Sequence, residues 1–82
     1  MIHTVRAEMV ANVLEVSVTT GSRVLPGDTL LLLESMKMEI PVLAEISGEV
    51  IEIAVAVGDV IQEGDPLVMI TVEGVKQEGG LR

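Results

Sequence analysis

The feature that most constrains the fold of this chain is an internal repeat with a period of 37 residues. When the sequence is shifted by that amount, residues 4–18 align with residues 41–55, and residues 21–30 align with residues 58–67. Two copies are too few for a solenoid, so the repeat predicts two interlocked halves related by a pseudo-twofold axis. The identical pairs are Val5/Val42, Ala7/Ala44, Glu8/Glu45, Val13/Val50, Glu15/Glu52, Val18/Val55, Gly21/Gly58, Gly27/Gly64, Asp28/Asp65 and Leu30/Leu67.

A half-buried strand is predicted near the start of each repeat. Within residues 12–19, side chains alternate with a period of two, which places alternate residues on opposite faces of a β-strand. The pattern predicts that Leu14, Val16 and Val18 point inward and Glu15, Ser17 and Thr19 outward; in the second copy Ile51, Ile53 and Val55 point inward, and Glu52 and Ala54 outward.

Turns and further strands follow in both repeats. The pattern Gly-x-x-Val/Ile-x-x-Gly-Asp spans residues 21–28 and 58–65, and its glycines permit the positive φ of tight turns. Only a very short strand fits between the two turns. No stretch keeps an apolar stripe at helical spacing, so the sequence predicts an all-β fold of about eight strands, a barrel or sandwich. The other expected strands are continuous apolar runs at 30–34 and 67–72, and segments 3–9 and 40–46.

Composition excludes several classes of function. The chain has 82 residues, enough for one domain, and no cysteine for disulfides or thiolate ligands. Its one histidine, His3, argues against a histidine-based metal site or catalytic triad. The net charge of −8 argues against nucleic acid and anionic membranes, and no aromatic residue is present to stack on bases. Without a spanning run or a signal peptide, a cytoplasmic protein is expected.

Residues 35–40 join the two repeats and contain Lys37, one of two lysines in the chain. A short link between antiparallel strands is a hairpin, which would place Lys37 at its tip, opposite the chain ends. The link has no Gly or Asn, so a turn type that tolerates ordinary residues is expected. Flanking Met36 and Met38 would form an adaptable contact surface at the tip, or alternatively fold back as core. Modification by a separate enzyme requires only that the lysine protrude.

The motif Glu34-Ser35-Met36-Lys37-Met38-Glu39 resembles the biotin-attachment motif, Glu-Ala/Ser-Met-Lys-Met, of biotinyl domains in biotin carboxyl carrier proteins and biotin-dependent carboxylases. The two Gly-x-x-Val/Ile-x-x-Gly-Asp turns match that family too, and the resemblance covers residues 5–72. It is strongest to the small stand-alone biotin/lipoyl attachment proteins of bacteria. Lipoyl domains share the fold but usually have Asp-Lys-Ala at the attachment site.

The resemblance implies a flattened β-barrel of two four-stranded antiparallel sheets with the lysine on an exposed hairpin. It also implies that biotin protein ligase joins biotin covalently to Lys37, that Met36 and Met38 are recognised by ligase and partners, and that carboxybiotin moves between biotin carboxylase and carboxyltransferase sites. The domain would be a non-catalytic carrier, binding no metal, and a monomer is expected. One departure is Met9-Val10-Ala11, where many members have Met-Pro-Gly; Ala11 therefore makes the local backbone geometry uncertain.

Two other functions remain open from the sequence. One is a lipoyl carrier on the same fold, and the other is an unmodified β-barrel module that binds a partner through its surface. The expected domain covers residues 1–73, followed by a disordered tail at residues 74–82 that is polar and contains glycine. The second lysine, Lys76, lies in that tail and is expected to stay unmodified.

Overall fold

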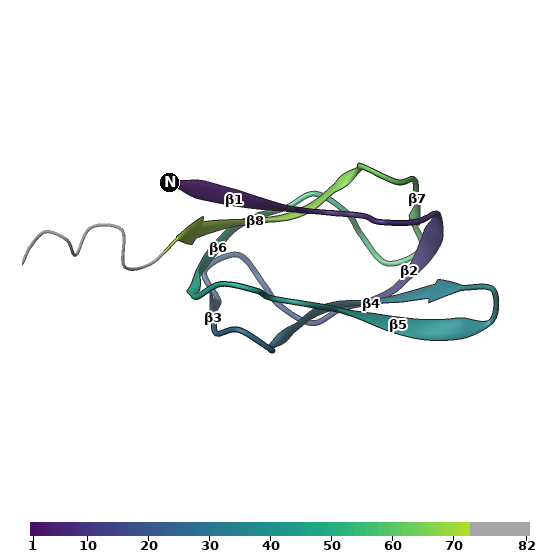
Figure 1. Ribbon diagram of the computed structural model, residues 1–82, viewed down its shortest axis with the longest axis horizontal. Coiled ribbons are helices and arrows are strands. Elements are labelled where there is room, and N and C mark those ends of the chain that lie inside the picture. The colour runs from purple at the N-terminus through teal and green to yellow at the C-terminus, as the bar shows by residue number, and fades with distance from the viewer. Residues whose placement is uncertain (73–82) are drawn as a thin grey trace, which may run out of the picture.

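The computed structural model describes residues 1–72, and the predicted tail at 74–82 lies outside the described residues. Strands and turns make up the described chain, which confirms the all-β prediction (Figure 1). The strands are β1 (Ile2–Arg6), β2 (Ala11–Val16), β3 (Arg23–Val24), β4 (Thr29–Ser35), β5 (Met38–Leu43), β6 (Gly48–Ile53), β7 (Val60–Ile61) and β8 (Pro66–Val72).

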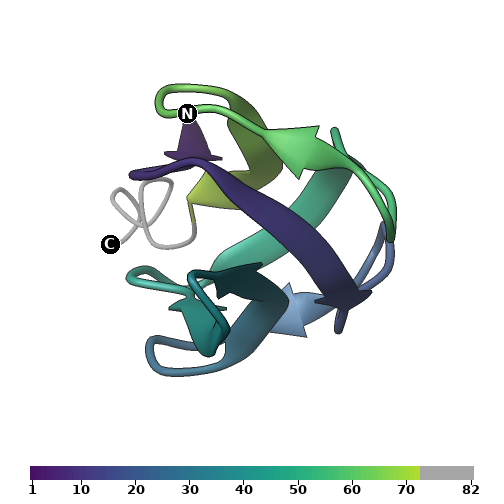
Figure 2. The ribbon, with the colours of Figure 1, turned by 90° about the vertical axis from the view of Figure 1, so that its right-hand side faces the viewer.

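The strands form two four-stranded antiparallel sheets, ordered β1-β8-β6-β3 and β5-β4-β2-β7. Adding 37 to the residue numbers converts each strand of the first half into its counterpart in the second, so each sheet mixes strands from both repeats. Viewed from the hairpin end, the two sheets enclose a flattened barrel (Figure 2). The predicted pair of interlocked halves is therefore confirmed.

The barrel interior is filled by aliphatic side chains, and the continuous apolar runs supply its centre. β4 lies between β5 and β2, and β8 lies between β1 and β6, which is why these two strands are apolar along most of their length. No side chain of Phe, Tyr or Trp is available, so Leu, Ile, Val and Ala fill the space. The fully buried large side chains are Leu30, Leu31, Leu67, Ile70, Val13, Val50 and Val68.

The prediction that Leu14 and Ile51 point inward is wrong. A β-bulge in β2 skips Leu14 in the pairing with β4, and a bulge in β6 skips Ile51 in the pairing with β8. An extra residue in one strand shifts the inward–outward alternation by one. The buried residues are therefore Val13 and Val50, while the positions after each bulge follow the predicted alternation; Val16, Val18, Ile53 and Val55 pack against the core.

Four tight turns hold the short strands in place. In each, a backbone N–H donates to the carbonyl three residues earlier at 3.0 Å, and the third residue is a glycine with φ between 91° and 98°. This combination defines a type II turn, and nothing lies within 4 Å of an added Cβ at these glycines, so the positive φ is what requires glycine. The last residue of each turn (Ser22, Asp28, Asp59 or Asp65) caps the turn by accepting the N–H of the first through its side chain.

Both ends of the described chain lie at the pole opposite the β4–β5 hairpin (Figure 1). Ile2 pairs with Thr71, and the Val72 N–H donates to the Met1 carbonyl at 2.9 Å. The predicted placement of the hairpin opposite the chain ends is therefore confirmed. Within residues 1–72 there is no helix that could cross a membrane.

Candidate functional site

Lys37 lies in the two-residue turn of the β4–β5 hairpin. The strands pair up to Ser35 and Met38, which leaves Met36 and Lys37 as the two turn residues. Both have positive φ, 53° at Met36 and 64° at Lys37. Two consecutive left-handed residues define a type I′ turn, the geometry that matches the twist of a hairpin but usually requires Asn-Gly. The expectation of a turn that tolerates ordinary residues is thus wrong, because this turn imposes an unfavourable backbone on Met36 and Lys37.

The Lys37 side chain projects into solvent. It is exposed, and its amine makes no hydrogen bond or ion pair with any residue from 1 to 72. The motif carboxylates, Glu34 and Glu39, face each other as a cross-strand pair one step below the turn. Like charges placed opposite each other repel, so this pair lowers the stability of the hairpin by a small amount.

Met36 and Met38 are at the surface rather than folded back into the barrel. The exposed fraction is 89% for Met36 and 60% for Met38. Apolar side chains this exposed contribute little to the fold, whereas a flexible thioether beside the lysine can adapt to a protein surface. Of the two alternatives for these residues, the structure therefore supports the contact surface.

The base of the hairpin is held by a side-chain contact to Val10, the residue that precedes β2. The Ser35 hydroxyl donates to the Val10 carbonyl at 3.1 Å. In the other half, β6 and β8 pair as far as Gly48 and Val72, but the equivalent pairing of β2 with β4 stops at Asn12 and Glu34. The Ser35 hydroxyl therefore links the two strands where the backbone ladder has ended.

Ala11 explains why that ladder is shorter. It takes the place of Gly48 in the repeat, and a Cβ built at Gly48 would lie 1.9 Å from the Thr71 carbonyl oxygen. The methyl group of Ala11 is incompatible with the equivalent close approach, so β4 separates from β2 at this point. The uncertainty that the sequence raised at Ala11 is thus resolved as a local shortening of the strand pair, with the strand itself intact.

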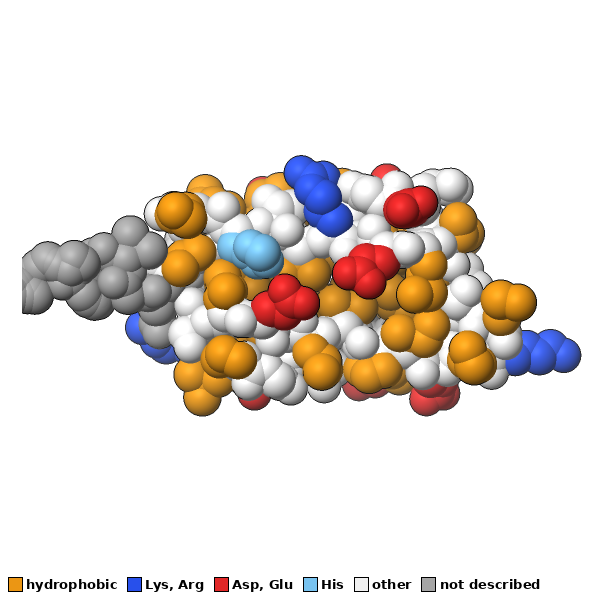
Figure 3. Space-filling view, viewed as in Figure 1, with side chains coloured by type: hydrophobic (Ala, Val, Ile, Leu, Met, Phe, Trp, Pro, Cys, Tyr) orange, Lys and Arg blue, Asp and Glu red, His pale blue; other side chains and the backbone are white. Residues whose placement is uncertain are grey.

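A shallow groove lies beside the hairpin. It is bounded by the start of β2, the end of β4 and β7. Hydrophobic side chains are exposed around this end of the molecule (Figure 3). Sequence reasoning did not identify the groove, although two exposed valines in it align with polar residues in the other repeat. Its lining residues are Met9, Val10, Ala11, Asn12, Glu34, Ser35, Met36 and Val60.

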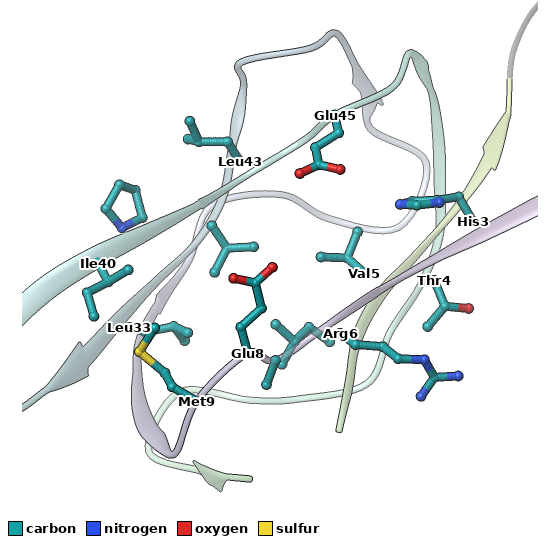
Figure 4. A pocket seen from close by; sticks show the side chains of 14 residues that line it. His3, Thr4, Val5, Arg6, Glu8, Met9, Leu33, Ile40, Leu43 and Glu45 are labelled. Carbon is teal, nitrogen blue, oxygen red and sulfur yellow. The ribbon is translucent and has the colours of Figure 1, made fainter. Parts of the chain in front are cut away.

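A second groove follows the open seam between β1 and β5, the edge strands of the two sheets (Figure 4). Val5 and Leu33 contribute apolar surface there, and the Glu8 and Glu45 carboxylates point toward it from opposite sides. His3 also lines this seam, half-buried in β1. Among residues 1–72 no three His, Asp or Glu side chains are grouped so that they could hold a metal ion.

The residues at the hairpin tip fit covalent attachment of a cofactor through an amide. Such attachment needs an accessible primary amine, space around it, and a fixed backbone that an enzyme can recognise. Lys37 supplies the amine, the turn fixes the backbone, and the exposed methionines leave the tip open. A flattened β-barrel that projects one unpaired lysine from a hairpin is the arrangement of a cofactor-carrying domain.

Comparison with known proteins identifies the class. A family model described as biotin-requiring enzyme, the biotin/lipoyl attachment family, matches residues 3–70. The chain therefore belongs to the biotin/lipoyl attachment family, as the motif predicted.

Named relatives point to biotin. The chain is 68% identical over 44 residues to the biotinylated protein TB7.3 homolog of Mycolicibacterium smegmatis and 64% identical over 44 residues to biotinylated protein TB7.3 of Mycobacterium tuberculosis. These matches cover 54% of this chain and 62% of each relative, so the chain spans about three-fifths of their length. The prediction of biotin as the covalent cofactor is confirmed by the family, whose model is described as biotin-requiring.

Solved structures agree on the fold. A single-chain, multi-domain long-chain acyl-CoA carboxylase superposes with a TM-score of 0.83 at 29% identity, over 93% of this chain and 8% of that one. The urea carboxylase of Kluyveromyces lactis superposes with a TM-score of 0.81 at 28% identity, over 87% of this chain and 6% of that one. The lipoyl domain of the Azotobacter vinelandii 2-oxoglutarate dehydrogenase complex shares the fold. It superposes with a TM-score of 0.72 at 24% identity, over 83% of this chain and 94% of that one.

Proposed function

We propose that this chain is a biotin carrier domain, spanning residues 1–73, in which Lys37 is the attachment point. One observation supports this assignment most strongly: the amine lies in a two-residue turn, between exposed methionines, with no partner among residues 1–72. The carboxylase structures that resemble this chain, and the relatives named as biotinylated, indicate the cofactor.

Attachment requires chemistry that the hairpin itself does not supply. To form an amide, the Lys37 amine must lose a proton and attack the activated carboxyl group of biotin. The only histidine, His3, is in β1, toward the end of the barrel opposite the hairpin. The motif residues on either side of Lys37 are methionines, which cannot accept a proton. Biotin protein ligase therefore provides the proton acceptor and uses ATP to activate the carboxyl group. We place the reaction, and the carrier, in the cytoplasm.

The attached group would work as a tethered substrate. When bound, biotin supplies a ureido ring that accepts a carboxyl group at a biotin carboxylase site and releases it at a carboxyltransferase site. The domain holds the tether on a fixed hairpin, so both sites meet the ring at a high effective concentration. No residue of the hairpin acts as an acid or base in these steps, so the domain is a carrier, and a monomer suffices for this role.

Intact mass spectrometry tests the proposal. The protein is co-expressed with an active biotin protein ligase, and the expected result is the added mass of one biotinyl group and a positive streptavidin blot. Lys37→Arg keeps the charge of the tip but should abolish both signals. Unmodified wild-type protein would overturn the assignment, and a lipoyl adduct formed with lipoate ligase would indicate the lipoyl carrier instead. Partner binding that persists in Lys37→Ala without modification would favour the interaction module.

A further inference from the structure

The internal repeat provides a comparison for the surface beside Lys37. Outside the two-residue turn itself, the strands and turns at the hairpin end have counterparts 37 positions away at the opposite end of the barrel. Positions that the core requires are apolar in both halves, as with Val13/Val50 and Leu30/Leu67. An exposed residue that is apolar in one half and polar in the other is therefore not explained by folding.

Val10 and Val60 are two such residues, and both line the groove beside the hairpin. Their exposed fractions are 56% and 64%. The counterpart of Val10 is Ser47, and the counterpart of Val60 is Arg23. Leaving two valines this exposed gains little for the free domain, because their burial is incomplete. The apolar groove next to the attachment lysine is thus a property of one end of the barrel.

The groove continues directly into the attachment site. Met36, which precedes Lys37 in the turn, lines the groove together with Val10 and Val60. An enzyme that brings the Lys37 amine into its own active site must cover this turn, and its surface then meets the groove. Acidic side chains lie beside it: Glu34 is in the lining, and Glu39 faces Glu34 across the hairpin. A partner with an apolar centre and a basic rim is complementary to this surface.

We infer that Val10 and Val60 form a docking surface for biotin protein ligase, which binds this groove in addition to the Met-Lys-Met turn. The inference rests on the proposed function, since it assumes that Lys37 is the acceptor. The ligase is chosen as the occupant because it alone must engage the unmodified amine. If a folded groove variant is biotinylated at the wild-type rate, the groove is left to the alternative occupants, which are the attached biotin and the carboxylase subunits.

The test compares the rate at which the ligase biotinylates three forms of the domain: the wild type, a groove variant and a control variant. The Val10→Ser/Val60→Thr double variant makes the groove polar while keeping a β-branched residue in β7. Leu25→Gln is the matched control: Leu25 is 62% exposed, lies outside the groove, and has Gln62 as its counterpart in the repeat. Loss of apolar contacts of this size is expected to lower kcat/KM for biotin transfer by about tenfold in the double variant. Leu25→Gln is expected to match wild type.

Several outcomes would overturn the inference. If the double variant keeps its thermal transition and is biotinylated at the wild-type rate, the groove is not read by the ligase. If its transition is lost, the single variants Val10→Thr and Val60→Thr decide the question by the same comparison. Shifts of the Val10 and Val60 amide resonances on biotinylation, measured without ligase, would assign the groove to the attached biotin. Absence of biotin from Lys37 in the wild type would instead refute the proposed function.

Discussion

The left-handed backbone at Met36 and Lys37 should make the attachment hairpin less stable than the same hairpin with residues that favour this turn, such as Asn-Gly. An L-residue other than Gly, Asn or Asp in this region costs about 1–2 kcal/mol. Met36 has φ of 53° and is 89% exposed, so replacing it removes strain without removing buried surface. Asn tolerates the left-handed conformation and is favoured at the first position of a type I′ turn. Met36→Asn should therefore raise the free energy of unfolding by about 1 kcal/mol.

For a domain of this size, that gain corresponds to a rise in Tm of about 4–8 °C. The chain has no Trp or Tyr, so the transition is followed by far-ultraviolet circular dichroism rather than by fluorescence. Met38→Asn is the control, because Met38 lies in β5 with ordinary φ and Asn is unfavourable in a strand. An unchanged or lower Tm for Met36→Asn would show that the turn is not strained. The same variant should be biotinylated more slowly, since it loses one recognition methionine.

Further predictions concern the acceptor, the partner and the two halves of the barrel. After co-expression with ligase, a peptide map should show biotin on Lys37 and none on Lys76; label on Lys76 would contradict the role of the fixed hairpin. The kcat/KM of biotin transfer should fall as salt is raised, because an acidic domain and a basic rim attract less when screened; a salt-independent rate would count against the basic rim. Gly48→Ala should lower the free energy of unfolding by about 3 kcal/mol, since its Cβ would lie 1.9 Å from the Thr71 carbonyl oxygen. Ala11→Gly at the counterpart position should change it by about 1 kcal/mol or less, and equal effects of the two substitutions would refute the close approach.

The repeat and the glycine turns made most of the fold predictable. Two halves with matching apolar positions predict one shared core, and the glycines mark where each short strand begins and ends. The sequence did not reveal the bulges in β2 and β6, which place Val13 and Val50 inward in place of Leu14 and Ile51. A bulge changes which side chains point toward the core, and the alternation of apolar and polar residues in the sequence does not show where it occurs.

The candidate site was predictable at the motif and not around it. Lys37, Met36 and Met38 stood out because a lysine between methionines joins the repeats. The type I′ turn could not be recognised in the sequence, because neither Met nor Lys has the preference for positive φ that marks such a turn. Val10 and Val60 were visible in the alignment as apolar residues opposite polar ones, but their exposure was needed to separate a surface role from a core role.

The two halves of the barrel differ where the hairpin is attached. Core positions and turns are kept in both, as the matching capping roles of Ser22 and Asp59 show. At the base of the hairpin, Ala11 replaces glycine, the ladder of β2 with β4 ends early, and the Ser35 hydroxyl makes the link to Val10. The hairpin is thereby released from one side of its sheet while a single hydrogen bond keeps its direction. A hairpin that is free on one side and anchored at its base leaves room for a partner to close over Lys37, and the apolar groove lies on that same side.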